Sequence, residues 1–389
     1  MSTPSRTPTP TVTISSPRGT IIGATESANI EVFKGIPYAE PPVPSNSPRL
    51  RPPQPITTAL GTVHATSYPP SMPSNEHPRD KMHNPLPPNI ASLLSPTIPN
   101  PEQSSEDCRT LNIWRPKNST PDSNYPVIFW IYGGGFQVGS SMDLPGGPIV
   151  NDSITLKMPV VFLSANYRLG VFGFLAGKQV KDDGSANLGL QDQRLALHRV
   201  ADNIKSFGGD PRKVTLWGQS AGRHVRLFTK WLSTTVTTRT RGSLYSKTRH
   251  DEFRSGYYGL SLFYLPRPDG TVVTASPEDA VSHGTYANVP FLIGNMEDEG
   301  STFVFNTTNI STTAQVSGYL SRSTTIEMRI KHRSIHWCPS TRMMRRSGLR
   351  STTSSLNSLY PQSKRLAAIL GGLYGSPNSP DHPDGNDER

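Results

Sequence analysis

The residues best suited to chemistry form a glycine and serine motif in the middle of the chain. Gly218-Gln219-Ser220-Ala221-Gly222 fits the G-x-S-x-G pattern and directly follows the apolar run KVTLW. In a nucleophile elbow of this kind, the serine sits on a sharp strand-to-helix turn, and small neighbours let adjacent backbone approach its hydroxyl. The motif predicts that Ser220 is a nucleophile, with an ordinary glycine-rich turn as the alternative.

A second glycine-rich segment is suited to stabilising a developing negative charge. Gly133-Gly134-Gly135-Phe136 follows the apolar run VIFWIY and precedes the serine motif in the chain. An oxyanion hole needs backbone N–H groups that point at the negative oxygen, and side chains at those positions would block the approach. The pattern favours an oxyanion-hole loop, and a plain glycine turn is again the alternative.

The elements around these motifs alternate between strand and helix. Short apolar runs rich in β-branched and aromatic residues predict strands at 111–116, 126–132, 158–170 and 213–220. Between the last two, residues 187–209 have helical apolar spacing, and Gly208-Gly209 is expected to end that helix. Strand, helix and strand in this order indicate a parallel α/β sheet. A further strand is expected within 288–305 and an amphipathic segment at 359–375.

Composition excludes several other classes of protein. The 389 residues are 34% hydrophobic and 17% charged, with 38 Pro, 32 Gly and 2 Cys, unlike a disulfide scaffold, a collagen or a coiled coil. The net charge of +10 is concentrated in residues 223–250 and 321–350, each with +7, so the remainder is net −4. Both segments lack clear hydrophobic periodicity. Neither segment has a known nucleic-acid motif, so we expect no nucleic-acid partner.

The expected domain organisation is a single large unit with loose ends. Residues 1–20 are Ser, Thr and Pro rich and predict a flexible arm, although TVTISS and TIIGA could form a short edge hairpin. Residues 21–375 predict one domain, in which the Pro-rich stretch 41–101 is a surface excursion. Residues 376–389 predict a disordered tail.

Taken together, these stretches resemble the type-B carboxylesterase and lipase family, the cholinesterase-like branch of the α/β-hydrolases. The match is nearly unbroken over 105–222, is weaker over 265–305, and covers roughly two thirds of the chain. The segments that carry it are VFKGIPYAEPPVPSNSPRLRPPQP, SEDCRTLNIWRP, PVIFWIYGGGFQVGSS, VVFLSANYRLGVFGFL and NLGLQDQRLAL through GQSAG. The resemblance implies an α/β-hydrolase fold, with a central, mostly parallel sheet flanked by helices and an incomplete C-terminal part.

The resemblance also implies a role for each matching site residue. The family's nucleophile falls on Ser220, and its oxyanion-hole donors fall on the backbone N–H groups of Gly134, Gly135 and Ala221. Its acid, which orients the imidazole of the triad, falls on Glu299 within Asp298-Glu299-Gly300. The implied reaction is hydrolysis of a small carboxylic ester through an acyl-serine, which requires neither a metal nor an organic cofactor.

The base of the triad does not match the family pattern. In this fold the histidine follows the acid, and His332, His336 and His382 are the candidates after Glu299. The family's histidine usually precedes a glycine, and none of these three does; His283-Gly284 has the dipeptide but precedes Glu299 and is expected to be structural or exposed. A second function therefore stays open, a catalytically impaired esterase-like binding protein or a defective gene product.

Two further departures point the same way. Arg223-His224 follows the elbow where the family has small residues, and a buried unpaired Arg there would be costly. The segment 359–375 resembles a part that the family places well before its histidine, so the chain is expected to end before the base. Altered coding of an ancestral esterase is our hypothesis for the two basic segments.

Cysteines and glycosylation sequons bear on where in or outside the cell the protein is found. In the family, the cysteine of the Glu-Asp-Cys signature usually bridges to an upstream cysteine, but no cysteine precedes Cys108. Because Cys338 is the other cysteine and lies in a basic segment, we expect Cys108 to be free and buried. Asn118, Asn151, Asn306 and Asn309 begin N-x-S/T sequons. With no visible signal peptide or membrane span, the default expectation is a cytoplasmic location, although family members are often secreted.

Overall fold

The computed structural model describes residues 9–42, 49–73, 104–222, 264–284, 292 and 311–322. The chain divides into two compact units. The first comprises residues 1–76, 92–245 and 264–288, and holds nearly all of the described residues. The second comprises 77–91, 246–263 and 289–389, and its described helix is α8 (Thr313–Arg322). Several expected features lie outside the described residues. They are the basic segments 223–250 and 321–350 (apart from 321–322), the strand expected within 288–305 (apart from Leu292), and the segments 359–375 and 376–389.

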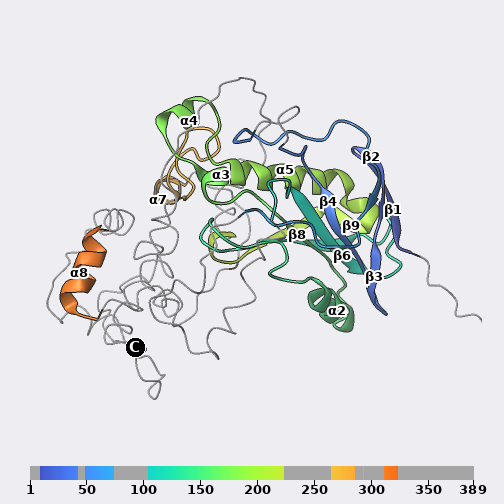
Figure 1. The fold of residues 1–389 in the computed structure, drawn as a ribbon. Helices are drawn as coiled ribbons and strands as arrows, with labels where there is room; N and C mark the ends of the chain where they lie inside the picture. Colours follow the sequence, from blue (N-terminus) through green and yellow to red (C-terminus); the bar gives the residue numbers. More distant parts are fainter. Residues whose placement is uncertain are drawn as a thin grey trace, which may run out of the picture. The chain divides into compact units, whose positions relative to one another are not determined.

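A six-stranded mixed sheet forms the centre of the first unit (Figure 1). Its order is β3-β4-β6-β8-β7-β9, and β3, β4, β6 and β8 pair antiparallel, whereas β7 pairs parallel with both β8 and β9. The strands are β3 (Ala24–Ser27), β4 (Ile30–Pro37), β6 (Thr110–Pro116), β7 (Tyr125–Ile131), β8 (Val161–Ala165) and β9 (Gly209–Gly218). The expected strands at 111–116, 126–132, 158–170 and 213–220 are all present.

Burial explains why the central strands read as continuous apolar runs. Every residue of β8 is buried, and so are six of the seven residues of β6, because helices cover both faces of the sheet. The long helix α5 (Leu188–Asn203) lies on one face and α2 (Gly147–Thr155) on the other (Figure 1). Shorter helices are α3 (Gly170–Phe174), α4 (Lys178–Asp182) and α7 (Pro277–Ser282).

The helix expected at 187–209 ends as its glycines predict. α5 passes into the 3-10 helix η4 (Ile204–Phe207), and Gly208 then adopts a left-handed conformation with φ +91°. Gly209 begins β9, so the chain returns directly to the sheet. Val200, Ile204 and Phe207 are buried, and the Phe207 ring meets that of Phe33 edge-on at 5.1 Å between centroids.

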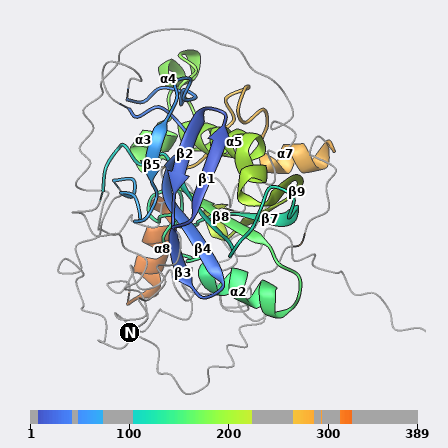
Figure 2. The ribbon, with the colours of Figure 1, turned by 90° about the vertical axis from the view of Figure 1, so that its right-hand side faces the viewer.

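A second sheet corrects the expectation for the N-terminal segment. β1 (Thr11–Ser15) and β2 (Arg18–Ile22) form an antiparallel hairpin, and β5 (Gly61–His64) pairs parallel with β2 (Figure 2). Val12 and Ile14 alternate with exposed threonines and are buried in the core, which holds residues 11–20 in the fold rather than in a flexible arm. β5 also gives the Pro-rich excursion a strand that the sequence did not predict.

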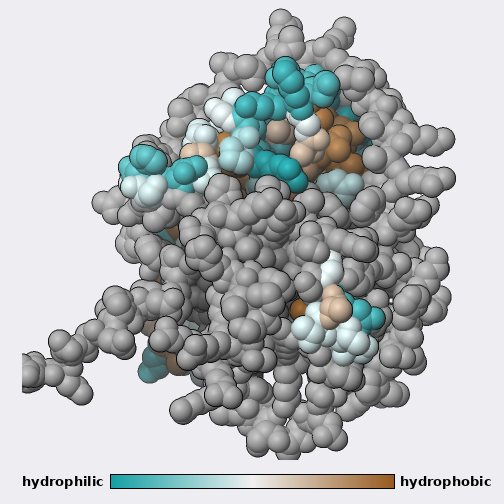
Figure 3. Space-filling model, turned by 90° about the vertical axis from the view of Figure 1, so that its left-hand side faces the viewer, coloured by the Kyte–Doolittle hydropathy of each residue, from teal (hydrophilic) through white to brown (hydrophobic). Residues whose placement is uncertain are grey.

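The described surface carries few large apolar side chains. Leu156, Met158, Trp217 and Leu292 are the exposed ones among the described residues. Figure 3 shows one face, on which hydrophilic side chains cover much of the described surface and the larger group of hydrophobic ones lies beside them. In the described part of the chain, no helix has the length and apolar character needed to cross a membrane.

A charged side chain of α5 is buried against an apolar part of the core. Arg199 is 7% exposed, and no residue in the described part of the chain accepts a hydrogen bond from its Nη1 or Nη2 atom. It lines a cavity of about 20 Å³ together with apolar side chains that include Ile14, Ile36 and Phe207. Burial lowers the pKa of Arg199 to about 10, and the negative charge of Asp202 offsets only part of this shift. Burying these donors unsatisfied therefore costs stability.

Replacing Arg199 by an apolar side chain of similar length should stabilise the protein. We expect Arg199→Met to raise the free energy of unfolding by about 1–3 kcal/mol, because the two unsatisfied donors are removed and the stem still fills the cavity wall. Urea unfolding followed by circular dichroism measures this. Arg212→Met, at a surface residue with an 88% exposed side chain, is the control and should change stability little. Destabilisation by Arg199→Met would show that the guanidinium is favourably placed.

Candidate active site

Ser220 lies just beyond the end of β9 in a strained conformation. It has φ +50°, which is uncommon for a residue with a side chain, and it is exposed. The turn closes through a hydrogen bond from the Gly222 N–H to the Gln219 carbonyl at 2.8 Å. A strained, exposed serine at the end of a parallel strand is the geometry that presents a nucleophilic hydroxyl to a substrate.

Glycine at position 222 lets the serine turn approach the neighbouring strand. A Cβ atom on Gly222 would lie 2.1 Å from the carbonyl oxygen of Ile131, the last residue of β7, and 2.9 Å from that of Tyr132. The parallel register of β7 and β9 pairs Ile131 with Gly218, so the two strands end at the same level. Any larger residue at 222 would force the turn away from β7.

The loop after β7 brings its glycines beside Ser220. A Cβ atom on Gly133 would lie 3.0 Å from the Ser220 Cβ and 2.8 Å from the Gln219 carbonyl oxygen. Gly134 and Gly135 follow with φ +96° and +62°, and a Cβ on Gly134 would lie 2.2 Å from the Val138 carbonyl oxygen. The two glycine motifs, 85 residues apart in the sequence, therefore meet at one end of the parallel strands.

Three backbone N–H groups of the two glycine motifs lie at this junction. Within the described residues, no backbone hydrogen bond has Gly134, Gly135 or Ala221 as its donor. The Gly134 carbonyl, by contrast, accepts from the N–H groups of Gln137 and Val138, which closes the loop on itself. The junction thus combines an exposed hydroxyl with spare N–H donors, as attack on a carbonyl group requires.

Two stacked tyrosines fix the start of the glycine loop. The Tyr167 hydroxyl donates to the Tyr132 carbonyl at 2.9 Å, and the Tyr132 hydroxyl donates to the Tyr167 carbonyl at 3.0 Å. Their rings are 4.4 Å apart between centroids and nearly parallel, and both residues are fully buried. Burial raises the pKa of both hydroxyls, so they remain protonated donors at neutral pH. Because Tyr132 directly precedes Gly133, the pair fixes the root of the loop.

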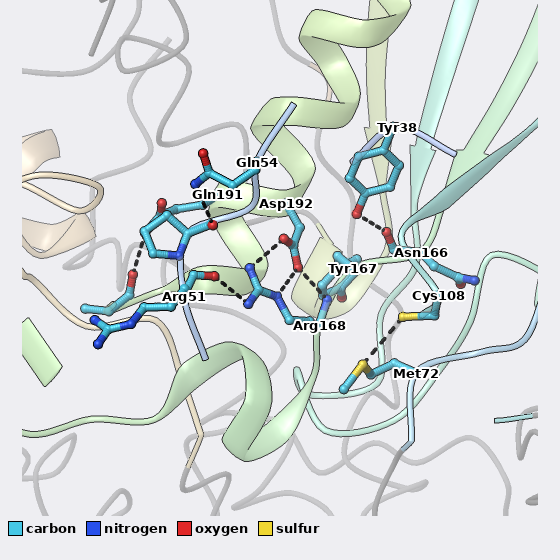
Figure 4. Close-up of polar contacts among 12 residues, drawn as sticks. Tyr38, Arg51, Gln54, Met72, Cys108, Asn166, Tyr167, Arg168, Gln191 and Asp192 are labelled. Atoms are coloured by element: carbon cyan, nitrogen blue, oxygen red, sulfur yellow. Dashed lines mark hydrogen bonds and ion pairs between the residues drawn. The ribbon is translucent and has the colours of Figure 1, made fainter. Parts of the chain in front are cut away.

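Serines and asparagines anchor the far end of the same loop. The Ser141 N–H donates to Oδ1 of Asn166 at 2.8 Å, and Nδ2 of Asn112 donates to the Ser141 hydroxyl at 3.0 Å. The Tyr38 hydroxyl donates to the Asn166 carbonyl at 2.6 Å (Figure 4). The loop from 133 to 141 is consequently held at both ends by buried hydrogen bonds from neighbouring strands.

A buried ion pair supports the segment between β8 and α5. Nε and Nη2 of Arg168 donate to the two carboxylate oxygens of Asp192 at 2.8 Å each, and the Arg168 N–H donates to the same carboxylate (Figure 4). Burial lowers the pKa of Arg168, but attraction to Asp192 outweighs it, so the net pKa is raised. Sequence reasoning missed this pair; the one signal was a charged residue, Arg168, shortly after the apolar strand β8.

Cys108 is free and buried, as expected. Its Sγ lies 3.5 Å from the Sδ of Met72, where a bridging partner would have to approach (Figure 4). Burial raises the pKa of the Cys108 thiol to about 12, so it is protonated and unreactive at neutral pH.

Part of the predicted triad falls on residues without a described structure. Glu299 and the histidines His332, His336 and His382 lie outside the described residues, so their roles stay predictions. His283 is exposed, and its Nδ1 is within hydrogen-bond distance of the Asp279 carbonyl and the Ser282 hydroxyl. It was expected to be structural or exposed, and it is exposed.

The chain has the α/β-hydrolase fold. Its mixed sheet has helices on both faces, and a serine turn follows a parallel strand. A model of the carboxylesterase family matches residues 8–230. Secreted lipase 1 of Botryotinia fuckeliana is 39% identical, over 95% of this chain and 73% of the lipase. A secreted triacylglycerol lipase of Gibberella zeae is 33% identical, over 93% of this chain and 70% of the lipase. The chain belongs to the carboxylesterase family, whose members are carboxylic ester hydrolases.

Solved structures agree on the fold. The crystal structure of EstA from Aspergillus niger superposes with a TM-score of 0.67 at 23% identity, covering 95% of this chain and 73% of that one. Both lipases above are named as secreted proteins, so the comparisons give no support to a cytoplasmic location.

A methyl group at Gly133 should disturb the nucleophile without touching its hydroxyl. We expect Gly133→Ala to slow the reaction of Ser220 with a fluorophosphonate by about 10–100-fold, because the added Cβ must push the loop away from the serine turn. Time-resolved labelling with a fluorescent probe measures the rate. Gly318→Ala adds a methyl group to α8 where no described residue outside the local helix backbone lies within 4 Å, and should leave the rate unchanged. Equal labelling rates in Gly133→Ala and the parent chain would contradict the close approach.

Removing one hydroxyl from the tyrosine pair should weaken the fold. Tyr167→Phe leaves the Tyr132 carbonyl without its buried donor, so we expect the free energy of unfolding to fall by about 1–3 kcal/mol. Urea titration gives this value. Tyr125→Phe, at a half-buried tyrosine on the first residue of β7, serves as the matched control. An unchanged midpoint in Tyr167→Phe would mean that the bond contributes nothing to stability.

Proposed function

We propose that this chain hydrolyses carboxylic esters through an acyl-enzyme at Ser220. The observation that carries the proposal is the strained, exposed Ser220 beside Gly133 at the carboxyl ends of β7 and β9. Membership of the carboxylesterase family supports the choice of ester over other acyl substrates. The identity of the acyl chain is not part of the proposal.

In the proposed first step, Oγ of Ser220 attacks the ester carbonyl carbon. A histidine takes the hydroxyl proton and passes it to the alcohol oxygen as the carbon–oxygen bond of the ester breaks. The N–H groups of Gly134, Gly135 and Ala221 stabilise the tetrahedral oxyanion. Within the described residues none of them donates a backbone hydrogen bond, which supports this role. Water then attacks the acyl carbon and gives a proton to the histidine, the bond between that carbon and Oγ breaks as the histidine passes the proton to Oγ, and the carboxylic acid leaves.

Glu299 is our proposed acid, and it would hold the imidazole in the correct tautomer. We assign no base among His332, His336 and His382, because none precedes a glycine as the resemblance requires. This sequence observation favours a second candidate function, a catalytically impaired esterase-like binding protein or a defective gene product. Oxyanion donors alone still give slow turnover, so the two candidates differ in rate by several orders of magnitude.

The proposal includes secretion, since the two lipases of Botryotinia fuckeliana and Gibberella zeae are named as secreted proteins. The expected partner is a small-molecule carboxylic ester, and no step needs a metal or an organic cofactor.

Substitution of the nucleophile tests the proposal directly. We expect Ser220→Ala to abolish fluorophosphonate labelling and to lower hydrolysis of a short p-nitrophenyl ester by at least about 10³-fold, since both reactions need Oγ. Ser282→Ala, at another exposed serine, should retain both signals. Labelling with turnover at the background rate would favour the impaired candidate. Labelling that persists in Ser220→Ala would overturn the assignment of the nucleophile.

A further inference from the structure

We propose that Asn118 carries an asparagine-linked oligosaccharide in the secreted protein. Asn118-Ser119-Thr120 is a sequon of the threonine form and lies in the loop between β6 and β7. The inference rests on the proposed secretion and is independent of catalysis at Ser220.

The two recognition residues of this sequon face solvent. Asn118 is exposed with φ +61°, which places it at the tip of a turn, and Thr120 is exposed as well. Among the residues that the structure describes, no hydrogen bond uses the Asn118 side chain or the Thr120 hydroxyl. Both groups are therefore available to a glycosyltransferase and to the sugar that follows.

The middle residue fixes the turn from the inside. Ser119 is buried, its hydroxyl donates to the Pro116 carbonyl, and a Cβ on Gly208 would lie 2.9 Å from the Ser119 Cβ. The Asn118 N–H donates to Oε1 of Glu31 at 3.4 Å. Since the backbone, and not the Asn118 side chain, holds the loop, an attached oligosaccharide displaces no contact of the fold.

The position also keeps the oligosaccharide away from the active site. The loop leads into the first residue of β7, Tyr125, whereas Gly133 follows its last residue, Ile131. A strand of seven residues spans on the order of 20 Å, so the glycan and Ser220 lie at opposite ends of the sheet.

A second described sequon has a different environment. Asn151-Asp152-Ser153 lies within α2, and the Ser153 hydroxyl donates to the Val150 carbonyl and accepts from the Val160 N–H. Because this hydroxyl is committed to the helix and to the start of the next strand, we expect Asn151 to remain unmodified. It is a matched control for Asn118.

The modification is a group transfer with a defined balance. Nδ2 of Asn118 forms a bond to the anomeric carbon of the first sugar of a lipid-diphosphate oligosaccharide. The bond from that carbon to the diphosphate oxygen breaks, the lipid diphosphate leaves, and a base takes one amide proton. No oxidant or reductant is required.

The test expresses the full chain behind a cleavable signal peptide in a eukaryotic secretory host. We expect Asn118→Gln and Thr120→Val each to remove one endoglycosidase-sensitive step in apparent mass, whereas Asn151→Gln and Thr120→Ser keep it. Analysis of all the protein that enters the secretory pathway makes the result independent of folding yield. Peptide-N-glycosidase should also convert residue 118 to Asp, which mass spectrometry locates.

Two outcomes would overturn the inference: an unchanged mass step in Asn118→Gln, or loss of the step in Asn151→Gln. Fluorophosphonate labelling of the same samples separates this inference from the proposed hydrolysis. Asn118→Gln should label at Ser220 as fast as the parent chain. Failure of labelling with the glycan present would count against the hydrolase alone.

Discussion

The close approach of two backbone segments, the end of β7 and the turn after β9, determines the position of every described site residue. A side chain on Gly222 would overlap the Ile131 carbonyl, and one on Gly133 would crowd Ser220. The parallel register ends both strands at the same level, so the serine turn and the glycine loop meet without a connecting side chain. The glycines that permit this packing also carry two of the backbone N–H groups proposed as oxyanion donors, those of Gly134 and Gly135.

Support for this contact comes from hydrogen bonds that are buried and reciprocal. Tyr132 follows β7 and Tyr167 follows the neighbouring strand β8, and the hydroxyl of each donates to the carbonyl of the other. This pair fixes the start of the glycine loop relative to β8. Arg168 binds Asp192 through two parallel bonds and so ties the same segment to α5. These interactions are made by three neighbouring pieces of chain, all of them before Ser220. These described contacts around Ser220 therefore lie within residues 104–222.

Sequence patterns predicted this part of the fold because local and tertiary signals agree there. β6, β7, β8 and β9 are apolar runs bounded by Pro or Gly, and Gly208 ends the helix as predicted. The hairpin of β1 and β2 was weighed only as an alternative, since its composition is that of a loose arm and only the alternation of Val12 and Ile14 reveals a buried face. Contacts between distant segments, such as the tyrosine pair and the ion pair of Arg168, leave no periodic signal and could not be read from the sequence. The site was predictable as far as its glycines and serine, whose types are dictated by backbone geometry.

Three buried arginines show how the same side chain can support or weaken one core. Arg168 meets a carboxylate that satisfies its charge. Among the described residues, by contrast, none accepts a hydrogen bond from the guanidinium nitrogens of Arg109, a residue 2% exposed, or from Nη1 and Nη2 of Arg199. An unpaired buried charge costs several kcal/mol, a large fraction of the 5–15 kcal/mol that typically separates folded from unfolded chains. Neither residue belongs to the contact between β7 and the serine turn, so this cost lowers the folded population while the geometry around Ser220 stays the same. The unsatisfied arginines therefore affect stability, whereas the contact between β7 and the serine turn sets the geometry around Ser220.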